Sequence, residues 1–245
     1  MIRKIKNKVK RFEQDNAGLQ RLLEDQMALA QLHKMFDDGV FLPLTSWSIS
    51  PREVLHACNE IVINNRHSVV EFGSGFSTLC IARMLKITGR ATRFVTVESN
   101  AAWAAELSKI LVKMGLSAFV NIIVAPLAPV SSEFSKGDQS WYDTSAIAPN
   151  IGTKDKIDMV IVDGPHGATC QYARFPAIPF LKNYLADDFV IFLDDSSRPE
   201  EQQIAMEWKK LLGAHLRDYH RYVVIGNAAS GFDPAPFGLT KLCNR

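Results

Sequence analysis

The chain has 245 residues, 47% of them hydrophobic, which suits one sizeable α/β domain with a short appendage rather than two equal domains. The 28 basic and 26 acidic residues nearly balance, so the net charge of +2 gives no support to a nucleic-acid-binding protein. The four cysteines form no CxxC pair, which argues against a zinc site and a disulfide framework and fits a reducing cytoplasm.

Residues 1 to about 36 are predicted to form a helix, because apolar residues recur at helical spacing from Ile2 to Leu32. Six basic residues between Arg3 and Arg11 occupy the place of a secretory apolar segment, and no run reaches the roughly 20 apolar residues of a membrane span. We therefore expect neither secretion nor a transmembrane segment. The helix docks on the domain, pairs with a second chain in a homodimer, or touches an anionic membrane surface.

A linker follows this helix, and Ser50-Pro51 is typical of a helix start. We predict an N-terminal helical extension with its linker over residues 1–50 and a second unit over residues 51–245. From Ser68 onward, short β-rich runs alternate with helical stretches, which indicates βαβ units and a parallel sheet.

The predicted strands and helices alternate along this second unit. Strands are expected at 69–72, 93–97, 120–124, 159–162 and 189–193, and helices at 78–86, 101–114 and 200–212. Residues 222–225 and 237–242 are the last two predicted strands. About a dozen residues without a helix separate them, too few for a parallel crossover, so we expect an antiparallel hairpin at the end of the sheet.

A glycine-rich turn lies between the first strand and its helix. Residues 71–77 read Glu-Phe-Gly-Ser-Gly-Phe-Ser, and such a turn lets backbone amides and a helix N-terminus approach a ligand. Thr78 stands where a dinucleotide-binding turn would have its third glycine. Glu98 ends the next strand, where its carboxylate can accept hydrogen bonds from two ribose hydroxyls, and Glu71 can order the loop or meet a ligand's ammonium group.

With these motifs, residues 68–243 resemble the class I S-adenosylmethionine-dependent methyltransferases. The resemblance implies a Rossmann-like three-layer sandwich whose seven-stranded, mostly parallel sheet has an antiparallel last strand. It also implies that the glycine turn holds the methionine part of the donor and that Glu98 holds the ribose. The predicted donor-binding residues are Glu71, Gly73, Ser74, Gly75, Ser77, Glu98 and Asp163. The adenine contact is not assigned, because Ala125 stands where many members have an acid.

Acidic residues follow two later buried strands. Asp163 follows one strand and Asp194 and Asp195 follow the next, so their carboxylates are expected to meet at the carboxyl edge of the sheet. Clustered acids raise one another's pKa unless positive charge lies among them, and a divalent cation with oxygen ligands would supply it. The Asp194-Asp195 pair also suits a helix N-cap, since Pro199 follows it closely.

This spacing resembles the catechol-type, metal-dependent O-methyltransferases. The resemblance implies Mg²⁺ or another divalent cation at Asp163, Asp194 and Asp195. His166 stands where that subfamily has a catalytic lysine, and histidine can also take a proton near neutral pH. His166 is therefore predicted to be a base, with a metal ligand, an orienting group and an ordinary loop histidine as alternatives.

The expected function is O-methylation of a small-molecule or glycan hydroxyl by a cytoplasmic enzyme, with His166 and Asp163 as catalytic residues. Two alternatives stay open: a metal-independent O- or N-methyltransferase, and a catalytically silent Rossmann-like partner subunit. Arg174 and Arg198 lie just beyond the strand ends and could bind an anionic acceptor. Residues 131–156 are expected to form a substrate wall, or to be pinned to the domain by their aromatic residues.

Overall fold

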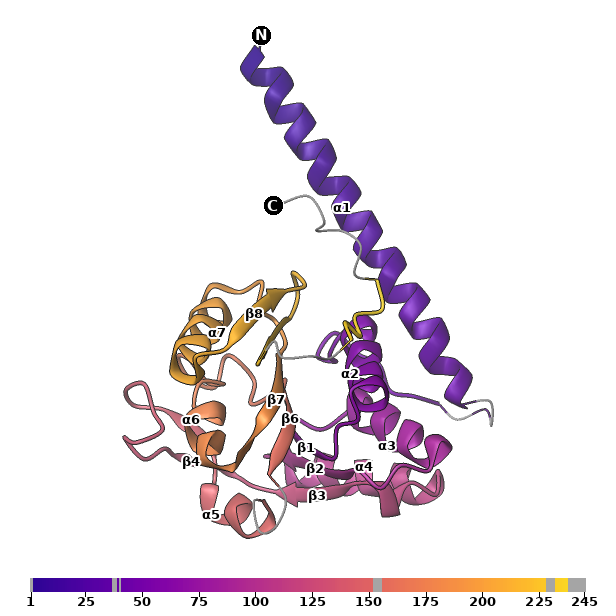
Figure 1. The fold of residues 1–245 in the computed structure, drawn as a ribbon, viewed down its shortest axis with the longest axis vertical. Helices are drawn as coiled ribbons and strands as arrows, with labels where there is room; N and C mark the ends of the chain where they lie inside the picture. The colour runs from indigo at the N-terminus through magenta and orange to yellow at the C-terminus, as the bar shows by residue number, and fades with distance from the viewer. Residues whose placement is uncertain (1, 37–38, 40, 152–155, 228–231, 238–245) are drawn as a thin grey trace.

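The computed structural model describes residues 2–36, 39, 41–151, 156–227 and 232–237. Within these ranges seven strands form one sheet, which has helices on both faces (Figure 1). The strands are β1 (Ser68–Phe72), β2 (Arg93–Glu98), β3 (Asn121–Val124), β6 (Ile157–Val162), β7 (Leu185–Leu193), β8 (His215–Asp218) and β9 (Val223–Gly226). Their order across the sheet is β3-β2-β1-β6-β7-β9-β8.

The strands from β3 to β7 pair in parallel, whereas β9 runs antiparallel to both β7 and β8. The carboxyl ends of β1, β2, β6 and β7 therefore meet along one edge of the sheet. The predicted Rossmann-like sandwich with an antiparallel last strand is confirmed.

The predicted hairpin at the end of the sheet uses different residues. β9 pairs with β8, which the sequence did not predict, because this short edge strand is polar and partly exposed and lacks an apolar alternation. Of the predicted strand at 237–242, Phe237 lies in a turn and the other residues lie outside the described ranges. An antiparallel hairpin at the end of the sheet is confirmed, with β8 in place of the predicted partner strand.

Two groups of helices cover the faces of the sheet (Figure 1). One face carries α2 (Pro51–Ile63), α3 (Phe76–Thr88) and α4 (Ala101–Lys113), and the other carries α5 (Thr144–Ile147), α6 (Ala177–Leu181) and α7 (Pro199–Leu212). Successive strand side chains alternate between the two cores, so Val69 packs toward the first face and Val70 toward the second. Ser50 caps α2 by accepting a hydrogen bond from the Glu53 amide at 3.3 Å, as its position before Pro51 predicts.

The N-terminal helix α1 (Ile2–His33) is the longest element and extends away from the sheet at its N-terminal end (Figure 1). A 3₁₀ turn at Lys34–Phe36 follows it. None of the helices in the described ranges combines the length and the apolar character that a bilayer crossing requires.

The segment after β3 contains a small antiparallel hairpin of β4 (Leu127–Pro129) and β5 (Ser140–Tyr142). The Trp141 side chain is fully buried and packs against Phe72 and Phe180. Trp141 therefore pins this segment to the domain, as the second of the two interpretations predicted, while its neighbour Tyr142 reaches the site described next.

Candidate functional site

The turn between β1 and α3 requires glycine at its first position. Gly73 has a φ of +95°, in the left-handed region, and a Cβ atom there would lie 3.0 Å from the backbone nitrogen of Gly164. The glycine turn therefore packs directly on the loop that follows β6. A side chain at residue 73 would force these two loops apart.

Glu71 lies behind this turn and organises it. Its buried carboxylate accepts hydrogen bonds from the hydroxyls of Ser77 (2.5 Å), Thr78 (2.5 Å) and Thr96 (2.7 Å). Burial raises the pKa of Glu71, and the three hydroxyl donors oppose that shift. These contacts fit the loop-ordering role that the sequence suggested for Glu71.

Glu98, at the end of β2, joins the turn from the other side. Its Oε2 atom accepts hydrogen bonds from the Ser74 amide (3.2 Å) and hydroxyl (2.8 Å), and its Oε1 atom accepts one from the Asn100 amide (2.7 Å). The Trp103 indole donates to the Ser74 carbonyl at 2.9 Å. We call residues 71–78 together with Thr96 and Glu98 the glycine corner.

Two cavities flank the glycine corner, with volumes of about 260 and 240 Å³. Gly73, Ser74, Asp163 and Trp47 line both cavities. The first cavity also reaches Gly75 and Ser77, and the second reaches Glu98, Tyr142, His166 and Asp195. Among the predicted site residues, Glu71 and Asp194 line neither cavity.

The three predicted metal-binding carboxylates do come together. Asp163 and the Asp194-Asp195 pair follow β6 and β7, and one oxygen from each lies within 4.8 Å of the others. The Asp195 carboxylate pairs with Arg174 (3.0 Å) and Arg198 (2.9 Å) instead of capping α7, whose first turn receives no side-chain cap.

Arginine side chains supply the positive charge between these acids. The buried Arg174 guanidinium bridges Asp163 (3.2 Å) and Asp195 (3.0 Å) through Nη2, and it donates to the Asp194 carbonyl at 2.9 Å through Nη1. Arg221 contacts both carboxylate oxygens of Asp194, at 3.1 and 3.3 Å. We call these three aspartates with Arg174, Arg198 and Arg221 the acidic edge.

A divalent cation does not fit this arrangement as it stands. Carboxylate oxygens are suitable ligands for such an ion. However, Nη2 of Arg174 already lies between Asp163 and Asp195, and both oxygens of Asp194 are held by Arg221. Three guanidinium groups face three carboxylates, so the acidic edge is balanced by the chain's own cations.

The acidic edge is still electrostatically strained at Asp163. Burial raises the pKa of Asp163 well above its usual value, the neighbouring Asp194 raises it further, and Arg174 lowers it. A carboxylate with a raised pKa binds a proton more readily than an ordinary aspartate. Asp163 can therefore accept a proton within the second cavity.

Glu53, in the first turn of α2, is a further acid beneath this edge. Its side chain is fully buried, and neither carboxylate oxygen has a hydrogen-bond partner within the described part of the chain. Burial raises the pKa of Glu53 well above its usual value, and the charge of Asp194 raises it further. No motif marks this residue in the sequence, because a glutamate in a first helical turn is ordinary.

His166 lies at the exposed rim of the second cavity. Its Nδ1 atom is 3.3 Å from the Ala168 amide, and its ring meets the exposed Trp47 ring edge-on, with 4.4 Å between ring centroids. Trp47 belongs to the linker before α2, and sequence analysis missed it because its neighbours carry no recognisable motif.

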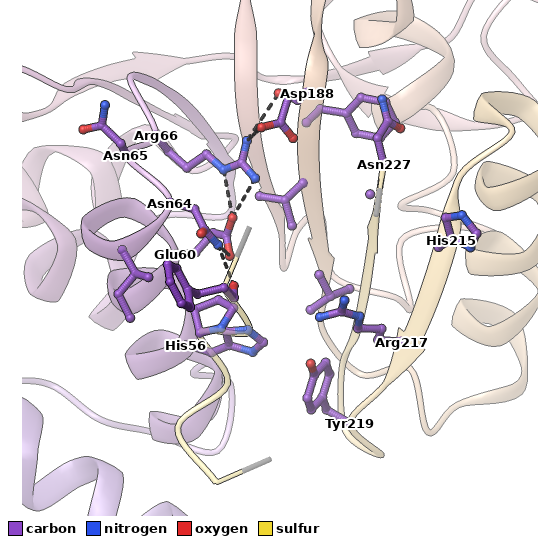
Figure 2. A pocket seen from close by; sticks show the side chains of 17 residues that line it. His56, Glu60, Asn64, Asn65, Arg66, Asp188, His215, Arg217, Tyr219 and Asn227 are labelled. Carbon is purple, nitrogen blue, oxygen red and sulfur yellow. Dashed lines mark hydrogen bonds and ion pairs between the residues drawn. The ribbon is translucent and has the colours of Figure 1, made fainter. Parts of the chain in front are cut away.

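A larger cavity of about 360 Å³ lies elsewhere, between α2 and the β8–β9 hairpin (Figure 2). None of the predicted site residues is among the described residues that line it. Figure 2 shows Arg66 between Glu60 and Asp188, which it contacts at 2.7 and 3.1 Å. This cavity lies apart from the glycine corner and the acidic edge, so it is not the candidate site.

Comparisons with known proteins agree with placing the candidate site at this edge of the sheet. A family model described as "Methyltransferase domain" matches residues 70–196, a range that includes the glycine corner, Asp163 and the Asp194-Asp195 pair. No curated protein was found to match the chain.

Several solved structures share the fold. The O-methyltransferase TomG from Streptomyces achromogenes, in complex with SAM, is 16% identical, with a TM-score of 0.51 over 83% of this chain and 89% of that chain. An O-methyltransferase from Bacillus cereus in complex with SAH is 14% identical, with a TM-score of 0.53 over 83% and 90%. The SAH-bound methyltransferase PaMTH1 from Podospora anserina is also 14% identical, with a TM-score of 0.53 over 83% and 87%. At these identities the likeness concerns the fold.

Proposed function

The chain belongs to the methyltransferase domain family, and from that premise we propose that it transfers a methyl group from S-adenosylmethionine to a hydroxyl of a small molecule or glycan without a divalent cation. One observation carries this proposal: Glu98, the glycine turn, Asp163 and His166 line a single cavity. Residues 51–245 would form the catalytic unit, and residues 1–50 would extend it.

The glycine corner suits the donor. Gly75, at the N-terminus of α3, has open space on its Cβ side and lines the first cavity, so a ligand can approach the main chain there. Glu98 is fixed by amide and hydroxyl donors at the same corner, with its oxygens at the wall of the second cavity. These features fit a donor with an amino-acid end and a ribose.

When bound, S-adenosylmethionine supplies a sulfonium methyl group that the acceptor oxygen attacks in line, so the carbon–sulfur bond breaks as a carbon–oxygen bond forms. The acceptor hydroxyl must lose its proton to a nearby base. We assign this base to His166. Its Nδ1 atom accepts a long hydrogen bond from the Ala168 amide. Nε2 becomes the proton acceptor in the other tautomer, in which Nδ1 carries the proton and this hydrogen bond is lost. Asp163 would orient the acceptor hydroxyl while Arg174 holds its Oδ1 atom.

The proposal is tested by separating donor binding from turnover. We expect calorimetry to detect S-adenosylhomocysteine binding by the unmodified protein and by the Asp163→Asn variant. Turnover, measured as release of S-adenosylhomocysteine with a panel of phenols and monosaccharides, should fall about 10²-fold in the variant, because the acceptor hydroxyl loses its orientation. A matched control is Glu106→Gln, an exposed carboxylate on α4. A protein that binds no S-adenosylhomocysteine would contradict the proposal.

Metal independence is tested at Arg174. We expect turnover to persist in EDTA, and the unmodified protein to bind no stoichiometric Mn²⁺ by electron paramagnetic resonance. The Arg174→Met variant should gain one Mn²⁺ site, because Asp163 and Asp195 then lack the cation that bridges them. Arg198→Met is the control, since it leaves the buried Arg174 in place. Tight binding of one Mn²⁺ by the unmodified protein, with turnover lost in EDTA, would restore the metal-dependent mechanism.

A further inference from the structure

Among the described residues, the N-terminal helix α1 is attached to the domain near its C-terminal end (Figure 1). There Glu24, Ala28 and Leu32 are buried against the domain, and Glu24 pairs with Arg52 of α2 at 2.6 Å. Residues before Glu24 continue the helix for about 22 residues, or roughly 33 Å at 1.5 Å per residue, beyond this attachment.

This free part of α1 exposes large apolar side chains. Phe12, Leu19 and Leu23 are 67%, 60% and 64% exposed, and the neighbouring Leu22 and Met27 are exposed as well. Most helical stability in proteins comes from packing an amphipathic face. The exposed stripe therefore requires a covering partner.

The spacing of the stripe identifies the kind of partner. Apolar residues and one asparagine recur at alternating intervals of three and four, which is the heptad pattern of a coiled coil. The a positions are Ile2, Val9, Asn16 and Leu23, and the d positions are Ile5, Phe12 and Leu19. We call these seven residues the seam. β-Branched residues at a combined with leucine at d, as at Leu19, favour two parallel strands, and a single asparagine at a fixes register and strand number.

The charges beside the seam favour pairing with an identical chain. Lys8 occupies a g position, and Glu13 occupies the e position of the next heptad. In a parallel pair, a g residue of one helix faces the following e residue of the other, so two copies of this sequence place Lys8 opposite Glu13 twice. A second copy of the chain can thus cover the apolar residues and also pair with the charged residues beside them.

The seam also faces away from the attached domain. At 100° per residue, Phe12, Asn16, Leu19 and Leu23 lie roughly 150° around the helix from Glu24, Ala28 and Leu32. The described members of the first group are exposed, whereas the second group is buried. Two helices can therefore meet along the seam while their domains lie on opposite sides.

We propose that residues 2–26 form a parallel, two-stranded coiled coil with a second copy of this chain. Sedimentation equilibrium of the full chain should then report a dimer that dissociates on dilution. Leu19→Asp combined with Leu23→Asp should give a monomer, and the thermal unfolding transition should stay within about 2 °C, because both leucines are exposed on the single chain. Ala17→Asp, at an exposed b position outside the seam, is the matched control and should remain dimeric.

Two further variants test the geometry. Leu23→Cys should cross-link two chains on oxidation, because residues at the same a position are adjacent only in a parallel pair. Asn16→Leu should raise the affinity or the strand number, because it removes the polar residue from the seam. A dimer that fails to cross-link through residue 23 would overturn the parallel arrangement. A monomeric unmodified chain that sediments with anionic phosphatidylserine vesicles would overturn the coiled coil in favour of a membrane surface.

Discussion

At the glycine corner the acids are held by neutral donors, whereas at the acidic edge they are held by guanidinium groups. Glu71 accepts from three hydroxyls, and Glu98 accepts from amides and a hydroxyl. At the acidic edge, Asp163 depends on Arg174, and Asp194 depends on Arg221. The two regions lie side by side and share Asp163 and the glycine turn as cavity walls.

Because of this difference, the two regions should respond differently when one partner of a carboxylate is removed. Removing one neutral donor leaves the carboxylate with its other hydrogen bonds, at a cost of about 0.5–1.5 kcal/mol. Removing one charged partner from a buried network leaves the opposite charge without compensation, at about 3–5 kcal/mol. Substitutions in the glycine corner should therefore act mainly by distorting its geometry. Substitutions in the acidic edge should act mainly by leaving a buried charge unpaired.

The largest expected effect tests the geometry of the glycine corner. Gly73→Ala should weaken S-adenosylhomocysteine binding at least about 100-fold by calorimetry, because its Cβ would collide with Gly164 at a strained φ. Gly89→Ala is the matched control. It has a similar positive φ of +64° but open space around it, so it should lower stability by about 1 kcal/mol without changing affinity.

The next effect tests the charge of the acidic edge through pH. If ionised Asp163 is needed, kcat/KM should fall tenfold per pH unit on the acid side, and the fall should begin well above the usual aspartate range because the pKa of Asp163 is raised. The measurement is a profile of log kcat/KM from pH 4 to 9. In Asp163→Asn the acid limb should change, and an unchanged limb would assign it to another group, such as the proposed base His166.

A smaller effect is expected at Glu98. Glu98→Gln keeps one acceptor oxygen but turns an amide group toward the N–H donors of Ser74 or Asn100, so donor affinity should fall about tenfold, or 1.4 kcal/mol. Calorimetry with S-adenosylhomocysteine measures this change. A loss as large as that of Gly73→Ala would mean that charge, and not only geometry, governs the glycine corner.

The smallest effect concerns stability. Because the pKa of Glu53 is raised in the folded state, the folded protein holds this proton more tightly, and stability falls as pH rises above the usual glutamate value. Glu53→Gln should therefore stabilise the protein at pH 8 by about 1–2 kcal/mol, seen as a Tm increase of roughly 2–8 °C. The difference should shrink toward pH 5. A variant less stable than the unmodified protein at pH 8 would contradict this.

The sequence predicted the glycine corner well because its parts are local. Residues 71–78 are continuous, and Glu98 ends the neighbouring strand, so strand and helix periodicity was enough to place them together. The alternation of apolar strands and amphipathic helices predicted the sheet for the same reason. The polar edge strand β8 carried no such period and was missed.

The acidic edge was predicted only in part. The positions of Asp163, Asp194 and Asp195 after buried strands predicted their convergence correctly. The cations that balance them come from segments without a motif: Arg174 lies in the turns before α6, and Arg221 lies between β8 and β9. No spacing rule links such distant residues, so charge balance could be found only in three dimensions.

The reversed direction of β9 has a consequence for biosynthesis. Val223 pairs with Leu193, so the two residues before β9 reach the end of β7, and the first of them, Arg221, contacts Asp194 there. Residues 68–98 emerge from the ribosome long before residue 221, and nascent domains fold from the N-terminal side. The glycine turn can thus assemble early, whereas Asp194 gains its counter-charge only after residue 221 has been translated.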